Sequence, residues 1–201
     1  MAAEVGGTNQ VTNTLRCFKE VKLLDYDSTA PDKYMDIKNY LCRIIPFPVE
    51  VEHIGSTSVV GLGGKGIIDV LIVTTKETMM RVVETLQSNG YKFNPTPGFG
   101  VFPERYFISG PYLYRRENLH VHYHITFKGS NNHKDHVQFR DYLRKHPDEA
   151  NRYFELKKKW ALEANLDTGI YTELKTPYVA EVLKKARNEE ANTLSSAPNR
   201  P

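Results

Sequence analysis

The sequence has few of the residues and segments that mark several large classes of protein. It contains two cysteines among 201 residues, Cys17 and Cys42, too few for a disulfide framework and at a spacing that matches no metal motif. No apolar run approaches the roughly 18 residues that a membrane-spanning helix needs. The first residues lack the apolar centre of a signal peptide. No GxxxxGK[ST] phosphate loop is present, because Lys65 is followed by glycine. We therefore expect a cytoplasmic protein with reduced thiols and no P-loop.

The remaining composition is typical of one globular domain. Hydrophobic residues make up 40% of the chain and charged residues 25%, and the formal net charge is +3. That balance supports a buried core and suits an anionic ligand. The small and polar ends, residues 1–14 and 188–201, are predicted to be disordered tails, which leaves residues 15–187 as a single domain.

The hydrophobic pattern alternates between helix and strand spacing. Helices are predicted over residues 31–45, 76–88 and 133–145, from Pro147 onward, and over 170–187 with a kink or break at Pro177. Strands are predicted over residues 49–54, 66–74, 91–93, 105–109 and 119–127, with a Gly- and Pro-rich loop over 95–103 and a turn near Gly110 or a longer loop to Asn118. The order predicts an α/β or α+β domain, a mixed sheet flanked by helices with a helical C-terminal part.

The densest chemical signal is the segment EHIGSTSVVGLGGKGIID, residues 52–69. Gly55 permits a tight turn, and Ser56, Thr57 and Ser58 supply hydroxyls and amides that can hold an anion. Lys65 adds a positive charge nearby. The segment predicts a binding site for a phosphate group, and the alternative is an ordinary turn between two strands.

Asp69 lies inside the hydrophobic strand predicted over residues 66–74. A carboxylate in an apolar strand is costly to bury alone, and a hard cation such as Mg²⁺ is one partner that stabilises it. A phosphate cradle followed by this carboxylate forms a coherent metal and phosphate site. The alternative is that Asp69 caps a neighbouring group, and spacing alone does not decide between the two.

Three histidines alternate along the strand predicted over residues 119–127. His120, His122 and His124 therefore share one face, where imidazoles can bind Zn²⁺, Mn²⁺ or Fe²⁺ or contact phosphate. The alternative is a half-buried strand whose histidines are hydrogen-bonded, and for His124 this alternative is preferred.

Several co-ordered motifs resemble one known family. HIGSTSVVGLGGKGIIDV is similar to the signature of GrpB proteins, and VKLLDYDSTAPDKY, LHVHYHITF, FRDYLRKHPDEANRYFELKKKWA and YTELKTPYVAEVL are similar to further stretches of that family. The resemblance covers most of residues 21–186. It implies a nucleotidyltransferase fold, in which a Gly-Ser turn follows one strand and acidic metal ligands lie on the next. Asp69 fits the first acidic position, but Leu71 stands where the second carboxylate is expected, a gap that the family shares.

The resemblance also implies further site residues. His120 and His122 match the family's histidine strand, so we expect them beside Asp69 as metal ligands and in catalysis. Glu52 and His53 match the motif before the turn, and Glu52 is a candidate for the missing carboxylate or for a general base.

The remaining candidates lie later in the chain. Arg105 is predicted to bind a triphosphate, with a surface ion pair as the alternative. Arg140, Tyr171 and Lys175 fall in matching stretches near the expected substrate cleft, and packing roles are the alternative. The lysine run at residues 157–159 is interpreted as a solvated helix face.

Together these residues predict a metal-dependent, nucleotidyltransferase-like protein. It would bind a nucleoside triphosphate with Mg²⁺ or Mn²⁺, or with Zn²⁺ through the histidines, and transfer a nucleotidyl group to an acceptor that the sequence does not name. The alternative is an inactive nucleotide- or anion-binding accessory module, which Leu71 favours. Nucleic acid is a weaker alternative because the charge is modest and no aromatic RNA-binding motif is present; salt-dependent binding to tRNA would revive it.

Overall fold

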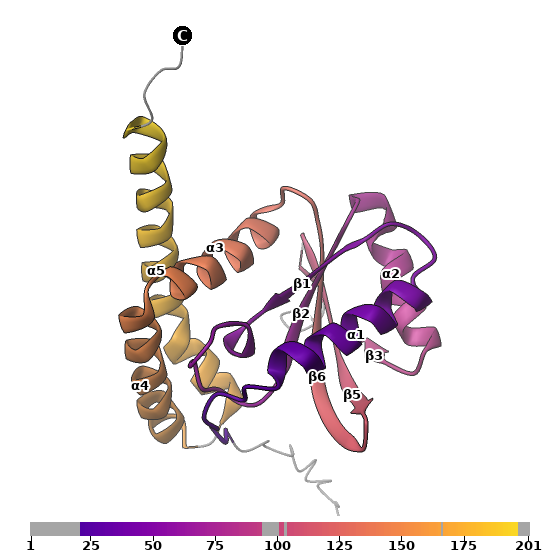
Figure 1. The fold of residues 1–201 in the computed structure, drawn as a ribbon, viewed down its shortest axis with the longest axis horizontal. Coiled ribbons are helices and arrows are strands. Elements are labelled where there is room, and N and C mark those ends of the chain that lie inside the picture. Colours follow the sequence, from indigo (N-terminus) through magenta and orange to yellow (C-terminus); the bar gives the residue numbers. More distant parts are fainter. Residues whose placement is uncertain (1–20, 94–100, 103, 166, 197–201) are drawn as a thin grey trace, which may run out of the picture.

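A mixed β-sheet separates two unlike helical layers (Figure 1). The computed structural model describes residues 21–93, 101–102, 104–165 and 167–196. Within these residues the sheet has six strands in the order β1-β2-β6-β5-β3, with β4 paired to β5. The strands are β1 (Glu50–Ile54), β2 (Ile68–Thr74), β3 (Lys92–Phe93), β4 (Val101–Phe102), β5 (Arg105–Tyr114) and β6 (Glu117–Phe127). The central β2–β6 pair is parallel, and the other pairs are antiparallel.

Two helices cover one face of the sheet. They are α1 (Ala30–Ile44) and α2 (Met79–Ser88), the second preceded by a short 3₁₀ turn over Lys76–Thr78. Their apolar faces and that face of the sheet form the main hydrophobic core, in which Ile37, Leu41, Val82, Leu86 and Ile72 are fully buried. Each buried side chain of this size contributes about 1.5–3 kcal/mol to folding, which makes this face the stable base of the molecule.

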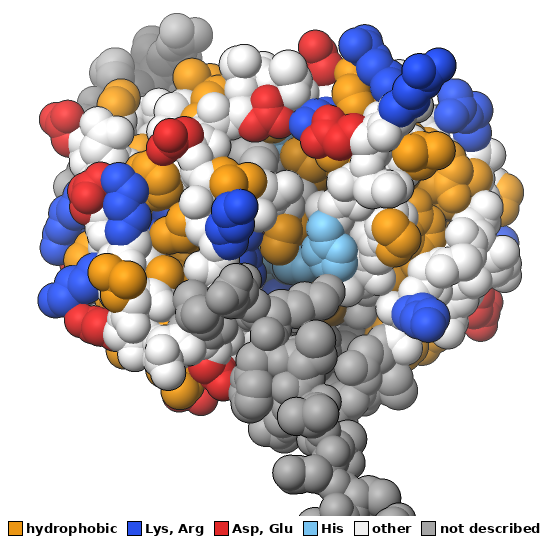
Figure 2. Space-filling view, turned by 90° about the horizontal axis from the view of Figure 1, so that it is seen from below, with side chains coloured by type: hydrophobic (Ala, Val, Ile, Leu, Met, Phe, Trp, Pro, Cys, Tyr) orange, Lys and Arg blue, Asp and Glu red, His pale blue; other side chains and the backbone are white. Residues whose placement is uncertain are grey.

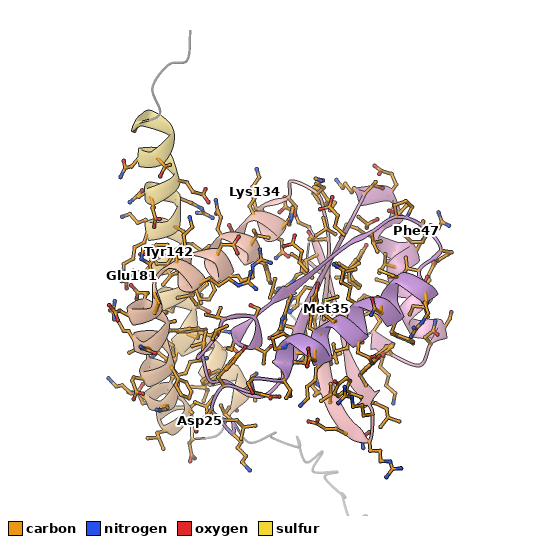
Figure 3. The ribbon with its side chains drawn as sticks, in the orientation of Figure 1. Asp25, Met35, Phe47, Lys134, Tyr142 and Glu181 are labelled. Atoms are coloured by element: carbon orange, nitrogen blue, oxygen red, sulfur yellow. The ribbon has the colours of Figure 1, made fainter. Side chains whose placement is uncertain are left out.

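Three helices form the second layer. They are α3 (Asn131–Lys145), α4 (Pro147–Glu163) and α5 (Thr168–Ser196). They lie together on one side of the sheet, and the end of α5 extends beyond the rest of the layer (Figure 1). Tyr142 of α3 and Glu181 of α5 belong to this layer, whereas Met35 lies on α1 (Figure 3). The predicted α/β architecture with a helical C-terminal part is confirmed.

Most predicted elements occur close to their expected positions. Pro147 stands in the first turn of α4, with Asp148 and Glu149 beside it, as the charge pattern predicts. The loop predicted over 95–103 lies mostly outside the described residues, apart from the two residues of β4. Cys42 is exposed and unpaired, while Cys17 and the predicted tail 1–14 lie outside the described residues.

The β5–β6 hairpin is longer than predicted. Pairing continues through Pro111 and His120 to Tyr114 and Glu117, so the chain turns at 115–116 and not near Gly110. Proline is tolerated there because, within the described residues, β3 pairs with Ile108 and Ser109 and does not extend to Pro111, which leaves that edge of β5 without a partner strand.

Helix α5 also departs from the prediction. It passes Pro177 as one helix and continues to Ser196, where a tail from residue 188 is expected. Contacts with α3 and its C-terminal cap explain the extension: His146 lies 2.7 Å from Glu189, and Gln138 donates to Glu190 at 2.8 Å. Residues 197–201 lie outside the described residues. No helix among the described residues is long and apolar enough to cross a membrane.

Candidate functional site

The Gly-Ser turn and the strand aspartate are in direct contact. Strand β1 ends at Ile54, Gly55 takes a positive φ of 71°, and Ser56–Ser58 form a 3₁₀ turn. A Cβ atom at Gly55 would lie 2.1 Å from Oδ2 of Asp69, which no side chain can tolerate. Glycine is therefore required by the backbone angle and by the close approach of the carboxylate. The predicted phosphate turn and Asp69 are therefore adjacent in the structure.

Two histidines converge on Asp69. In the parallel β2–β6 pair, Asp69 lies opposite His122 and Leu71 lies opposite His124. Nδ1 of His122 is 3.1 Å from Asp69 Oδ1, and Nε2 of His124 is 3.5 Å from the same oxygen. Ligand atoms of these three side chains all lie within 4.8 Å of one another. We call this set the Asp69 cluster.

The membership of the Asp69 cluster differs from the prediction. His124, for which a packing role is preferred from the sequence, belongs to it, and His120 does not. His120 instead places its ring 5.2 Å from that of His122. The difference arises from the register of the β2–β6 pair. His124 lies opposite Leu71, and its side chain reaches Asp69 diagonally, two residues away along the strand.

The electrostatics of the Asp69 cluster favour an ionised carboxylate beside a neutral His124. Burial alone would raise the pKa of Asp69, but hydrogen bonds from His122 and His124 outweigh it and hold that pKa well below its usual value. Burial lowers the pKa of His124, and it lowers the pKa of His136 on α3 to about 3. The His136 ring lies 4.9 Å from that of His124, and its Nδ1 is 2.8 Å from the Asn132 carbonyl.

The donor set of the Asp69 cluster fits a divalent metal. One carboxylate with two imidazoles is a donor set that suits Zn²⁺ and Fe²⁺. The ring of Phe107 packs on both imidazoles, at 5.0 Å from His122 and 5.2 Å from His124, and limits their movement. Viewed from below Figure 1, histidine side chains lie in a hollow with lysine or arginine side chains beside them (Figure 2).

Lys157 is the functional candidate that the sequence interpretation misses. It is 2% exposed, and its ammonium donates to Ser56 Oγ at 3.0 Å and to the Gly63 carbonyl. Burial lowers the pKa of Lys157 to about 7. The signal is the helical spacing of α4, because Lys157 falls between the buried Tyr153 and Trp160 on one stripe. Its neighbours do form a solvated face, since Lys158 and Lys159 are exposed and pair with glutamates.

Other predicted cations lie within electrostatic range of one another and of Asp69. Burial lowers the pKa of Lys175, and positive charge on Lys65 and Arg105 lowers it further while Asp69 raises it. These shifts show that Lys175 lies within electrostatic range of Asp69 and of both cations. Lys65 is exposed and lies 5.9 Å from the centre of the Tyr171 ring. Tyr171 itself is buried in the core of the helical layer, so its ring packs and burial raises its pKa to about 12.

Glu52 and Arg140 form a structural pair at the edge of the site. Nη1 of Arg140 donates to Glu52 at 2.7 Å and to the His53 carbonyl at 3.2 Å, while Nε donates to Asp141 at 2.7 Å. Glu52 also lies 3.5 Å from Nε2 of His133. Glu52 is thus held by Arg140, and it is not part of the Asp69 cluster.

His53 supports the turn from the opposite side. Its ring stacks on Tyr34 at 4.5 Å, and its Nε2 lies 3.0 Å from Thr57 Oγ1. Burial lowers the pKa of His53 to about 4, so the ring is neutral at neutral pH. The Ser58 hydroxyl donates to the Gly55 carbonyl at 2.7 Å. Thr57 and Ser58 are both buried, so their side chains shape the turn, and Ser56 is the hydroxyl on the side of Lys157.

The fold and the arrangement of this site indicate a broad structural class. A sheet with a Gly-Ser turn after one strand and a carboxylate on the next is nucleotidyltransferase-like. The Cid1 poly(U) polymerase, solved as an H336N mutant bound to MgATP, superimposes with a TM-score of 0.50 at 11% identity and covers 75% of this chain and 50% of that one. At that identity the likeness shows the fold alone.

The chain belongs to the GrpB family. Residues 20–185 match the family described as GrpB protein. The crystal structure of GrpB from Enterococcus faecalis superimposes with a TM-score of 0.70 at 25% identity, covering 84% of this chain and 99% of that one.

Two curated relatives agree. UPF0157 protein YqkA of Bacillus subtilis (strain 168) is 31% identical over 178 residues, covering 85% of this chain and 50% of the relative. A UPF0157 protein of Pseudomonas aeruginosa is 34% identical over 173 residues, covering 83% and 67%. This chain therefore spans about half the length of the Bacillus relative.

Proposed function

We propose that the protein binds a nucleoside triphosphate with a divalent metal between the Gly-Ser turn and the Asp69 cluster, and transfers a nucleotidyl group to an acceptor hydroxyl. One observation carries the proposal: the Gly55 backbone lies against the Asp69 carboxylate, so a phosphate on the turn and a metal on Asp69 would be adjacent. A polymerase with a similar fold has been solved bound to MgATP, which supports a nucleoside triphosphate with a divalent metal as the ligand.

The phosphate side of the site is cationic. Ser56 and the turn amides would contact the phosphates, with the Lys157 ammonium already beside the Ser56 hydroxyl. Lys65, Lys175 and Arg105 supply further positive charge around Asp69. Preorganised cations of this kind stabilise negative charge that develops on a leaving pyrophosphate without reorganising.

The metal side would use Asp69, His122 and His124. A bound divalent metal neutralises phosphate charge and lowers the pKa of a coordinated hydroxyl. Because two of the three donors are imidazoles, we expect Mn²⁺ or Zn²⁺ to bind more tightly than Mg²⁺.

The test measures ligand binding by the whole chain, using isothermal titration with MnCl₂ and a nucleoside triphosphate. Asp69→Asn should weaken metal-nucleotide binding by at least about 100-fold, because losing a ligand exceeds the 10–100-fold cost typical of outer partners. Asp148→Asn, on the exposed start of α4, should bind like the unaltered protein. Equal binding by Asp69→Asn and the unaltered protein would refute the proposal.

A second function is favoured by Leu71. This residue occupies the position of a second carboxylate and is fully buried against Ile54, Val73 and Val137. Glu52, the other acid on that face, is held by Arg140. A site with one carboxylate supports an accessory module that binds nucleotide without turnover. Incubation with α-³²P-labelled nucleotide, Mn²⁺ and cell extract separates the two functions: label transfer and pyrophosphate release identify the enzyme, and binding without either identifies the module.

A further inference from the structure

A cavity lies behind the Gly-Ser turn. It has a volume of ≈ 620 Å³ and lies between the start of α1, the turn and the end of α3. Its lining includes His53, Thr57 and Ser58 but none of the residues of the Asp69 cluster. The turn is therefore a shared wall, with the Asp69 cluster on one side and this cavity, which we call the rear cavity, on the other.

The walls of the rear cavity are mostly apolar and aromatic. Tyr34 of α1, already stacked on His53, contributes a flat ring, and Leu143 of α3 closes the opposite wall. Met35 and Val60 line it while remaining 48% and 82% exposed. Small-molecule sites are typically concave spaces of about 300–1,000 Å³ with apolar walls and a few polar groups, and the rear cavity meets each criterion.

Arg144 gives the rear cavity its charge. Among the described residues that line it, this is the one formally charged side chain, and none is acidic. Nε of Arg144 donates to the Ser58 carbonyl at 3.0 Å. Its ion-pair partner, Asp141, is 3.6 Å away and already accepts from Arg140 at 2.7 Å. The guanidinium therefore has donors to offer an anion, and it suits a carboxylate, sulfonate or phosphate group.

We propose that the rear cavity is a second ligand site, for a flat aromatic small molecule that carries one anionic group. The aromatic part packs between Tyr34, Met35 and Leu143, and the anion pairs with Arg144. This site is independent of the proposed function, because no residue of the Asp69 cluster takes part in it.

Binding in the rear cavity also acts on the turn. Arg144 holds the Ser58 carbonyl and His53 holds Thr57 from the cavity side, while Lys157 holds Ser56 from the other side. A ligand that draws the guanidinium towards itself alters the support of Ser58. Two ligands that meet a shared wall in this way affect each other's binding reciprocally.

A pair of fluorescent probes tests the site. The anionic probe is 8-anilino-1-naphthalenesulfonate, and the neutral probe is N-phenyl-1-naphthylamine, which has the same rings without the sulfonate. Both should bind the unaltered protein with a stoichiometry of one. Arg144→Leu should weaken the anionic probe at least tenfold and leave the neutral probe within twofold, whereas Arg144→Lys should restore part of the anionic probe's affinity.

Matched methionine variants locate the probes. Met35→Glu places a negative charge at the rim and should weaken the anionic probe at least tenfold, whereas Met80→Glu, on α2 with a similar 41% exposure, should change neither affinity. Thermal unfolding of each variant checks its fold. Anionic-probe binding that survives both Arg144→Leu and Met35→Glu, or that falls equally in Met80→Glu, would overturn the proposal.

The coupling to the turn has its own measurement. In a ¹⁵N–¹H spectrum of the whole chain, the anionic probe should shift the amide signals of Gly55 and Ser56, which do not line the rear cavity. If the signals of Thr57 and Ser58 move while those of Gly55 and Ser56 stay unchanged, the site stands and the coupling is refuted.

Discussion

The two faces of the central strand β2 have different roles: one packs in the hydrophobic core, and the other carries the candidate site. Val70 and Ile72 face α1 and α2 and belong to the main core. Asp69 and Leu71 point to the opposite face, where Val137 of α3 packs on the cluster that contains Leu71 and Asp69 stays half-buried. The same division continues in β6, whose Val121, Tyr123 and Ile125 are fully buried in the core while its histidines face the site. Stability and chemistry are thus separated by side-chain alternation along shared strands.

The largest expected effect comes from the core face. Ile72→Ala should lower the free energy of unfolding by about 2–5 kcal/mol, because a fully buried isoleucine leaves a cavity that the sheet cannot close. Metal affinity, measured by titration below the unfolding transition, should stay within twofold. Asp69→Asn should show the reverse pattern, and equal loss of metal binding in both variants would break the comparison.

The second largest expected effect is a loss of stability when the contact between Gly55 and Asp69 is disturbed. Gly55→Ala brings a positive φ together with a clash against Asp69, whereas Gly61→Ala has a similar φ of 81° with nothing within 4 Å. The positive φ costs about 1–3 kcal/mol at either position, and at Gly55 it is combined with a ψ of −170°, a region that essentially only glycine populates. The clash should add about 1–3 kcal/mol at Gly55 alone, as overpacking does. Denaturant unfolding of the two variants measures the difference, and equal destabilisation would show that Asp69 does not approach the turn.

The smallest effect is a pH dependence from Lys157. Its pKa is about 7 in the folded protein and lies below the ordinary lysine value of 10.5, so the unfolded chain binds more protons between these values. The stability that this group contributes is complete above the unfolded pKa of 10.5. It decreases progressively as the pH falls from there and is fully lost once the pH has passed below about 7. Relative to Lys157→Met, the unaltered protein should gain about 1 kcal/mol for each pH unit between 7.5 and 9.

Lys158→Met provides the matched control for that prediction. Lys158 is the exposed neighbour and pairs with Glu155 at 2.7 Å. Unfolding curves of this variant should run parallel to those of the unaltered protein across the same pH range. A slope that persists in Lys157→Met would assign the pH dependence to another group.

Much of this architecture follows from local pattern. The apolar run before Thr74 predicts a central strand, and the Gly-Ser turn with Asp69 marks the site, because local residue types and spacing carry both signals. The presence of His124 in the Asp69 cluster, in place of His120, cannot be predicted from local pattern. Alternation places both histidines on one face, and only the β2–β6 register decides which one reaches Asp69. That register is a long-range property that no window of sequence contains.

Lys157 and α5 show the same limit from packing. A lysine beside two further lysines predicts solvent exposure, and only the docking of α4 against the turn buries the first of the three. The polar end of α5 shows no apolar stripe that predicts a helix, and it is held by polar contacts to His146 and Gln138. Where a polar residue is ordered by a partner that is distant in the sequence, composition wrongly predicts that the residue is exposed or disordered.

The parallel pairing of β2 with β6 has a consequence for how the chain reaches its native state. Asp69 and His122 are 53 positions apart, and β6 must insert between β2 and β5 before they meet. During synthesis β2 is complete long before its neighbour emerges from the ribosome, so one of its edges waits unpaired while the hairpin is still being made. Pairing between such distant segments is intrinsically slow. Uptake of the proposed metal ion should therefore accompany the last stage of assembly. An ion added at the start of refolding should not accelerate the first phase of collapse.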